Sequence, residues 1–143
     1  MRKYKLHTNY KQILADTITP VSVYLKIRDK FPNSILLESS DYHANDNSFS
    51  YICFNPIASI KVENQKIEMN FPDGFSEIIP IDTDVNVAKE IENFSNQFET
   101  EKSDFKFITQ GLFGYLAYDA IQYFEKVYAI MNEANPTKYP NLY

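Results

Sequence analysis

Two turn signals divide residues 57–80 into three short strands, and this stretch constrains the fold more than any other. Strands are expected at 57–63, 66–70 and 76–80. Asn64-Gln65 predicts a tight turn between the first two strands, and Pro72-Asp73-Gly74 predicts a turn before the third. Strands joined by such short turns pair as antiparallel neighbours. An antiparallel sheet is therefore expected in the middle of the chain.

Other segments add further strands and helices. Strands are expected at 3–9, 34–38 and 49–54, followed by two extended runs from Phe105 to Tyr118, broken at Gln110-Gly111. Helices are expected at 20–31, 84–98 and 119–127. Strands outnumber helices and mostly run as hairpins, so the sequence predicts the α+β class, with a mainly antiparallel sheet and about three helices.

The predicted helices have recognisable starts and faces. Thr19-Pro20 supplies an N-cap followed by proline at the first helical position. An amphipathic helix over 84–98 is predicted by apolar residues at helical intervals, namely Val87, Ile91, Phe94 and Phe98. Asp119 is expected to cap the last helix.

Composition bounds the class of protein. The chain has 143 residues, of which 44% are hydrophobic, so one domain of ordinary size is expected. Its net charge is −5 and its lysines are scattered, which argues against nucleic acid or a membrane surface as a partner. The single cysteine, Cys53, lies in an apolar strand and is expected to be an inert core thiol. One cysteine, no signal peptide and no long apolar span together predict a cytoplasmic protein.

No complete catalytic site is visible in the sequence. His7 and His43 are far apart and have no partner at metal-ligand spacing. Three glycines in the whole chain leave no room for the usual phosphate-binding loops. The residues alone therefore predict neither catalytic residues nor a metal or cofactor in this chain.

Two stretches stand out from this background. The apolar strand Ile35-Leu36-Leu37 ends in Glu38-Ser39, which either cap a turn through backbone hydrogen bonds or face a ligand. In the stretch 110–125, QGLFGYLAYDAIQYFE, small residues alternate with bulky aromatics. By itself that alternation is typical of tight packing between a strand and a helix.

Taken together, the two stretches resemble the amino-terminal domain of anthranilate synthase component I. The family's LLES strand end is similar to residues 36–39, and its GGL.GY..YD segment is similar to residues 111–119. The family's hairpin around a proline is similar to the segment at Asn55-Pro56. The resemblance covers nearly the whole chain in order. It implies that residues 1–143 are a regulatory domain that ends before the catalytic, chorismate-binding domain.

The resemblance also implies a site and partners. In feedback-inhibited members the LLES strand end lines a pocket for free tryptophan, so Glu38, Ser39 and Ser50 are the expected inhibitor-binding residues. The full-length enzyme is a lyase that makes anthranilate and pyruvate from chorismate and ammonia or glutamine, with Mg²⁺ in its catalytic domain. The implied partners are tryptophan, that carboxy-terminal domain and the glutamine amidotransferase subunit, component II.

One position departs from the family pattern, and two other interpretations stay open. Some members have a Lys or Arg shortly before the strand that follows LLES, where this chain has Asn47-Ser48-Phe49-Ser50. The chain also resembles the corresponding domain of aminodeoxychorismate synthase, although Glu38 favours the anthranilate branch. A packing or interaction domain without a ligand is the remaining alternative.

Overall fold

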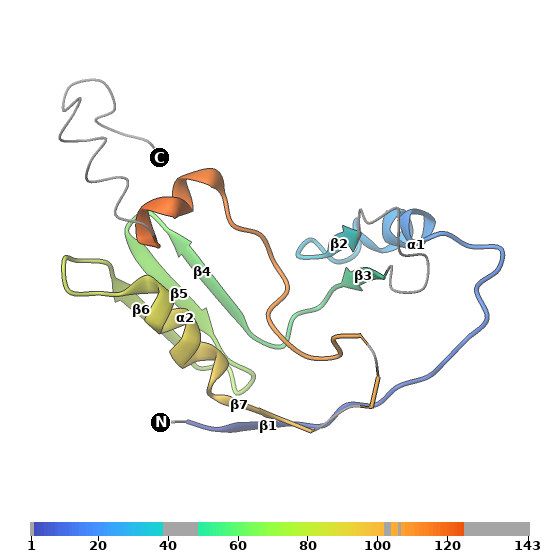
Figure 1. Ribbon diagram of the computed structural model, residues 1–143, viewed down its shortest axis with the longest axis horizontal. Helices are drawn as coiled ribbons and strands as arrows, with labels where there is room; N and C mark the ends of the chain where they lie inside the picture. The colour runs from blue at the N-terminus through green and yellow to red at the C-terminus, as the bar shows by residue number, and fades with distance from the viewer. Residues whose placement is uncertain (1, 39–48, 102–103, 106, 125–143) are drawn as a thin grey trace. The chain divides into compact units, whose positions relative to one another are not determined.

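The computed structural model describes residues 2–38, 49–101, 104–105 and 107–124. The described residues form an α+β fold, as expected, with two α-helices, one 3-10 helix and seven strands (Figure 1). The strands are β1 (Tyr4–Leu6), β2 (Ile35–Glu38), β3 (Ser50–Cys53), β4 (Ser59–Glu63), β5 (Lys66–Asn70), β6 (Ser76–Pro80) and β7 (Phe98–Thr100). The helices are α1 (Pro20–Ile27), α2 (Val87–Ser95) and the 3-10 helix η2 (Tyr118–Tyr123).

The chain divides into two compact units. Unit 1 takes Met1–Tyr4, Ala58–Glu99 and Tyr115–Tyr143, and unit 2 takes Lys5–Ile57 and Thr100–Gly114. The three-stranded antiparallel sheet β4-β5-β6 lies in unit 1, and the antiparallel pair β2-β3 lies in unit 2. The expectation of a single regulatory domain over residues 1–143 stays a prediction, and each unit is described by itself.

The sheet of unit 1 follows directly from its alternating sequence. In β5, Ile67 and Met69 are buried while the residues between and beside them are exposed. Ile67 lies opposite Val62 on β4 and Ile79 on β6, so these three side chains share one face of the sheet. The turn at Asn64-Gln65 is confirmed, because both residues have positive φ (52° and 57°) and thereby allow the tight reversal.

Unit 1 also contains the hydrophobic core of the described residues. Its five buried hydrophobic side chains are Ile67, Met69, Phe71, Val87 and Phe94. Two of them, Val87 and Phe94, come from α2, so this helix covers the apolar face of the sheet. Burying one such side chain contributes about 1.5–3 kcal/mol, so these side chains stabilise the packing of α2 on the sheet.

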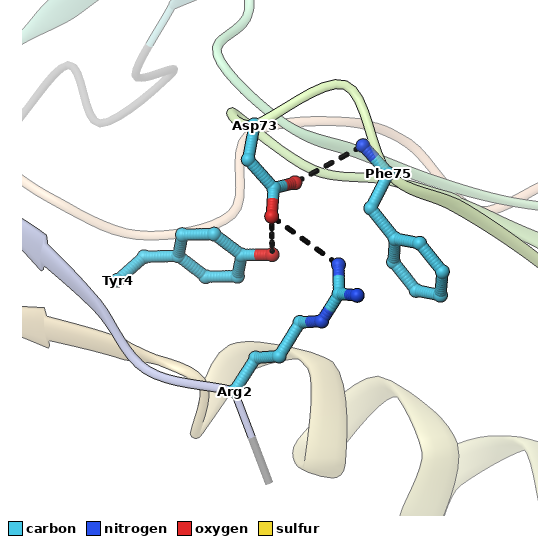
Figure 2. A network of polar contacts seen from close by, with 4 residues as sticks. All are labelled: Arg2, Tyr4, Asp73 and Phe75. Atoms are coloured by element: carbon cyan, nitrogen blue, oxygen red, sulfur yellow. Dashed lines mark hydrogen bonds and ion pairs between the residues drawn. The ribbon is translucent and has the colours of Figure 1, made fainter.

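A network around Asp73 ties the N-terminal residues to the β5–β6 turn (Figure 2). One oxygen of the Asp73 carboxylate accepts hydrogen bonds from the Tyr4 hydroxyl (3.1 Å) and from Arg2 (3.2 Å). The other oxygen accepts one from the backbone amide of Phe75 (3.0 Å). The Arg2 guanidinium also lies 3.7 Å from the centre of the Phe75 ring. These contacts hold the start of β1 against unit 1.

Unit 2 has much less buried apolar surface. Helix α1 begins as predicted, with a capping box in which Thr19 and Ser22 exchange hydrogen bonds, and Pro20 occupies the first turn. It contacts both β2 and β3. Of the described residues in this unit only Ser34 is buried, which leaves its apolar side chains partly exposed.

Three predicted helix boundaries are corrected. The helix expected at 20–31 ends at Ile27, and turns follow in which the amides of Lys30 and Phe31 both donate to the Ile27 carbonyl. The helix expected at 84–98 is shorter at both ends, and Phe98 instead begins β7 and stacks on Tyr4. Phe98 fits the helical spacing of the apolar residues, although it lies in a strand, because its side chain packs against the same core as the helix.

The end of the described chain differs more strongly from the prediction. The extended runs expected from Phe105 to Tyr118 form no strand among the described residues. Asp119 is not an N-cap: it lies inside η2, whose N-cap is Ala117 and has no side-chain capping bond. Tyr115 and Tyr118 are 87% and 93% exposed, so the tight packing expected for this stretch is absent around them.

Candidate functional site

Glu38 and Ser50 lie opposite each other across the β2–β3 pair. Glu38 is the last residue of β2, Ser50 is the first residue of β3, and the antiparallel register makes them direct partners. Directly opposite residues project their side chains to the same face, with Cβ atoms about 4.5–5.5 Å apart. The structure therefore brings two of the three predicted inhibitor-binding residues together, at the end of the β2–β3 pair where residues 39–49 connect the two strands.

The face that carries this pair is apolar deeper in the hairpin. Side chains alternate along a strand, so Leu36 shares the face of Glu38, and Ile52 shares the face of Ser50. Leu36 and Ile52 are partners in the same register and are half-buried. This face thus combines the apolar side chains of Leu36 and Ile52 with the Glu38 carboxylate and the Ser50 hydroxyl at its edge.

The polar groups of the pair are exposed to solvent. Glu38 and Ser50 are both exposed, and no hydrogen bond or ion pair to another described residue engages the Glu38 carboxylate. A carboxylate accepts up to four hydrogen bonds and a hydroxyl donates one and accepts two. The arrangement can therefore bind a cationic, hydrogen-bond-donating group such as an ammonium.

The third predicted residue, Ser39, lies outside the described residues, and so does Asn47-Ser48 of the departure from the family pattern. Phe49 lies near the position where some family members have a Lys or Arg. Its ring packs on that of Phe107, with the centroids 5.6 Å apart. An aromatic contact with the segment that follows β7 therefore stands just before Ser50.

The opposite face of the hairpin shows a residue that sequence reasoning missed. Tyr51 accepts a hydrogen bond from the backbone amide of Ile108 at 3.1 Å through its hydroxyl. Its ring also contacts that of Phe113, with the centroids 5.5 Å apart. No local sequence pattern indicated this contact, because Tyr51 and Ile108 lie 57 positions apart in the chain.

Other chemistry-bearing residues are accounted for locally. Burial raises the pKa of the Cys53 thiol, in line with an unreactive cysteine. His7 lies 2.8 Å from Glu101 through its Nδ1, in a solvent-exposed pair. His43 lies outside the described residues. Within the described ranges, no group of three or more His, Cys, Asp or Glu side chains could hold a metal ion.

The Asp73 network is polar and organised, but its groups satisfy one another. Its three donors hold the pKa of the Asp73 carboxyl below the ordinary value, first the Phe75 amide and then Tyr4 and Arg2. Both oxygens of the Asp73 carboxylate accept hydrogen bonds within the network. The network therefore serves as a structural tie, and the Pro72-Asp73-Gly74 turn was the only part of it visible in the sequence.

Comparison with known proteins places this geometry in context. Over 135 residues, or 93% of the chain, the sequence is 33% identical to anthranilate synthase component 1 of Lactococcus lactis subsp. lactis. Proteins of the same name from Acinetobacter calcoaceticus and Aquifex aeolicus match 94% and 87% of the chain at 27% and 26% identity. This chain is related to anthranilate synthase component 1.

The matches cover most of this chain but only part of the length of each relative. The chain spans 27% of the length of the Lactococcus protein and a similar share of the others. No family model and no solved structure matches the sequence. The resemblance to anthranilate synthase component 1, which was inferred from the LLES and GYLAYD stretches, is thus confirmed. In the part of the chain that the structure describes, no helix has the length and apolar character needed to cross a membrane.

Proposed function

We propose that this chain is the tryptophan-binding regulatory domain of an anthranilate synthase component 1, and that it serves feedback control of tryptophan biosynthesis. The observation that carries the proposal is the cross-strand pair Glu38–Ser50, in a chain whose curated relatives share that name. The enzyme's conversion of chorismate to anthranilate is assigned to a separate catalytic domain. Residues 1–143 carry the regulatory site, and inhibition is a coupling between two sites.

The site has one group for each part of the inhibitor. The Glu38 carboxylate accepts hydrogen bonds from the tryptophan ammonium, and the hydroxyls of Ser50 and Ser39 donate to its carboxylate. Leu36 and Ile52 offer the indole an apolar surface on the same face as the polar pair. An exposed carboxylate that has no hydrogen bond to the described residues and shares its face with apolar side chains suits a zwitterion better than it suits a purely structural turn cap.

The proposal extends to the partners of the whole enzyme. Component II, the glutamine amidotransferase subunit, supplies ammonia, and the catalytic domain binds chorismate with Mg²⁺. The tryptophan pocket is completed by residues of that domain. The chain alone is therefore expected to bind tryptophan weakly, to make no anthranilate from chorismate and to act in the cytoplasm.

Titration of the isotope-labelled chain with L-tryptophan, followed by NMR, tests the proposal. Amide shifts are expected to move first in β2 and β3, with a dissociation constant weaker than about 1 μM, which corresponds to roughly −8.2 kcal/mol. Glu38→Gln keeps the size of the side chain and removes its charge, so it should abolish most of these shifts.

Glu77→Gln is the matched control, because Glu77 is an exposed glutamate on a strand of unit 1. That variant should bind tryptophan as the wild type does. Shifts confined to residues outside β2 and β3, or equal losses in both variants, would contradict the proposed site.

A further inference from the structure

The segment 107–113 packs on β3 beside the candidate site. Its Ile108 amide donates to the Tyr51 hydroxyl at 3.1 Å, and its Phe113 ring contacts the Tyr51 ring. Both contacts lie within unit 2. This segment, the 107–113 strap, therefore holds Tyr51 through one hydrogen bond and one aromatic contact.

The strap contacts the residues on both sides of Ser50, the first residue of β3. Phe107 packs on Phe49, which precedes Ser50, and Phe113 packs on Tyr51, which follows it. Ser50 itself pairs with Glu38. The two aromatic contacts thus fix the backbone at the point where β3 presents Ser50.

The strap is also tied to the residues after β1. The Gln110 side-chain amide donates a hydrogen bond to the Thr8 hydroxyl. One residue earlier, His7 pairs with Glu101, close in sequence to the strap. The strap is therefore held from two directions, by β3 and by the segment that follows β1.

We infer that Tyr51 is a positioning residue that couples the 107–113 strap to the Glu38–Ser50 pair. Tyr51 projects to the face opposite Glu38 and Ser50, so it does not touch a ligand bound on their face. It acts by keeping the first residues of β3 in register with the end of β2. The effect on tryptophan affinity rests on the proposed function, whereas the effect on the strand pair does not.

Tyr51→Phe tests the inference, because it removes only the hydroxyl that accepts the Ile108 amide. Hydrogen exchange at Ile108 and along the β2–β3 pair should become about 2- to 10-fold faster, as expected for the loss of one neutral hydrogen bond. The dissociation constant for L-tryptophan should rise by a similar factor. Gln110→Ala, which removes the hydrogen bond from the middle of the strap to Thr8, should shift both measurements in the same direction.

Tyr24→Phe is the matched control. Tyr24 lies in the same unit, and its hydroxyl donates to the Ser34 carbonyl at 3.3 Å, away from the strap. It should leave hydrogen exchange at Ile108 and at the Glu38–Ser50 end of the strand pair, and the tryptophan affinity, at their wild-type values, because its hydrogen bond lies at the Ile35–Cys53 end.

The outcomes separate this inference from the proposed function. Unchanged β2–β3 exchange in Tyr51→Phe, or an equal change in Tyr24→Phe, overturns the positioning role. Absence of tryptophan binding in every protein, including the wild type, overturns the proposed function, while the exchange measurements still decide the role of Tyr51. Faster exchange together with unchanged affinity overturns the coupling to the ligand.

Discussion

Ser34 illustrates at the scale of one residue how burial and hydrogen bonding together decide what a polar group does. It is 8% exposed, and its hydroxyl oxygen has no hydrogen-bond partner among the described residues. A buried hydroxyl without a partner loses its hydrogen bonds to water and forms none within the protein. Ser34 is therefore a site where a polar atom costs stability.

Ser34→Ala should leave the free energy of unfolding unchanged or raise it by up to about 1 kcal/mol, because it removes the unpaired hydroxyl. Ser22→Ala makes the same chemical change in the capping box of α1, and should cost about 0.5–1 kcal/mol. Urea denaturation of both variants measures the difference. A larger loss for Ser34→Ala than for Ser22→Ala would mean that the Ser34 hydroxyl has a partner.

Asp73 gives a prediction for the pH dependence of stability. Its pKa is lower in the folded chain than the ordinary aspartate value of about 3.9, with the Phe75 amide as the main cause. A lowered pKa stabilises the fold above the ordinary value, and that stabilisation is lost as the pH falls through the folded value. Asp73→Asn should therefore melt at a lower temperature than the wild type at pH 7.

The difference in melting temperature should shrink as the pH is lowered below about 3.9. Glu77→Gln, at an exposed strand position of the same unit, should show no such dependence. A difference between Asp73→Asn and the wild type that stayed constant from pH 7 to pH 3 would contradict the role of the Asp73 charge.

At the scale of elements, the sequence predicted β5 and β6 to the residue and missed β7. The first two are bounded by the turns at Asn64-Gln65 and Asp73-Gly74, whose backbone requirements are local. The third depends on Phe98 stacking against Tyr4, a contact between distant parts of the chain. Local turn chemistry is readable from sequence, and long-range pairing is not.

The same distinction applies to the candidate site. Glu38, Ser39 and Ser50 were identified by resemblance to a family motif. The pairing of Glu38 with Ser50 depends on the register of β2 and β3. That register cannot be predicted from the sequence of the residues that connect the two strands. The contact of Tyr51 with Ile108 joins residues 57 positions apart and had no local signal.

The Asn64-Gln65 turn gives a prediction for the stability of the β4–β5 hairpin. Gln65 has a φ of 57°, a conformation that glycine adopts without steric cost. Gln65→Gly should therefore raise the free energy of unfolding by up to about 1 kcal/mol. Glu68→Gly, within the neighbouring strand, should lower it by about 0.5–1 kcal/mol. Chemical denaturation of the two variants compares them, and destabilisation by Gln65→Gly would contradict the assigned turn.

At the scale of the whole molecule, the two units differ in how well they are buried. The five buried hydrophobic side chains of the described residues all belong to unit 1, whereas unit 2 has only Ser34 buried. Unit 1 also leaves Tyr115, Leu116 and Tyr118 largely exposed. Exposed apolar surface of this kind promotes association.

We expect the chain to self-associate at high concentration. Sedimentation velocity over a 100-fold concentration range should show dimers or larger species, and Leu116→Ser combined with Tyr118→Ser should reduce them. Thr17→Ser, a conservative change at an exposed polar position of unit 2, is the control. A monomer at every concentration would show that these side chains do not mediate association.

The central claim is that the Glu38 carboxylate binds the tryptophan ammonium, and steady-state inhibition of an anthranilate synthase that carries this chain tests it most directly. Loss of a charge-assisted hydrogen bond worth about 1.5–3 kcal/mol should raise the inhibition constant of Glu38→Ala by roughly 10- to 150-fold. Activity without tryptophan and the melting temperature should stay near their wild-type values. An unchanged inhibition constant together with a lowered melting temperature would contradict the account and would make Glu38 a turn cap.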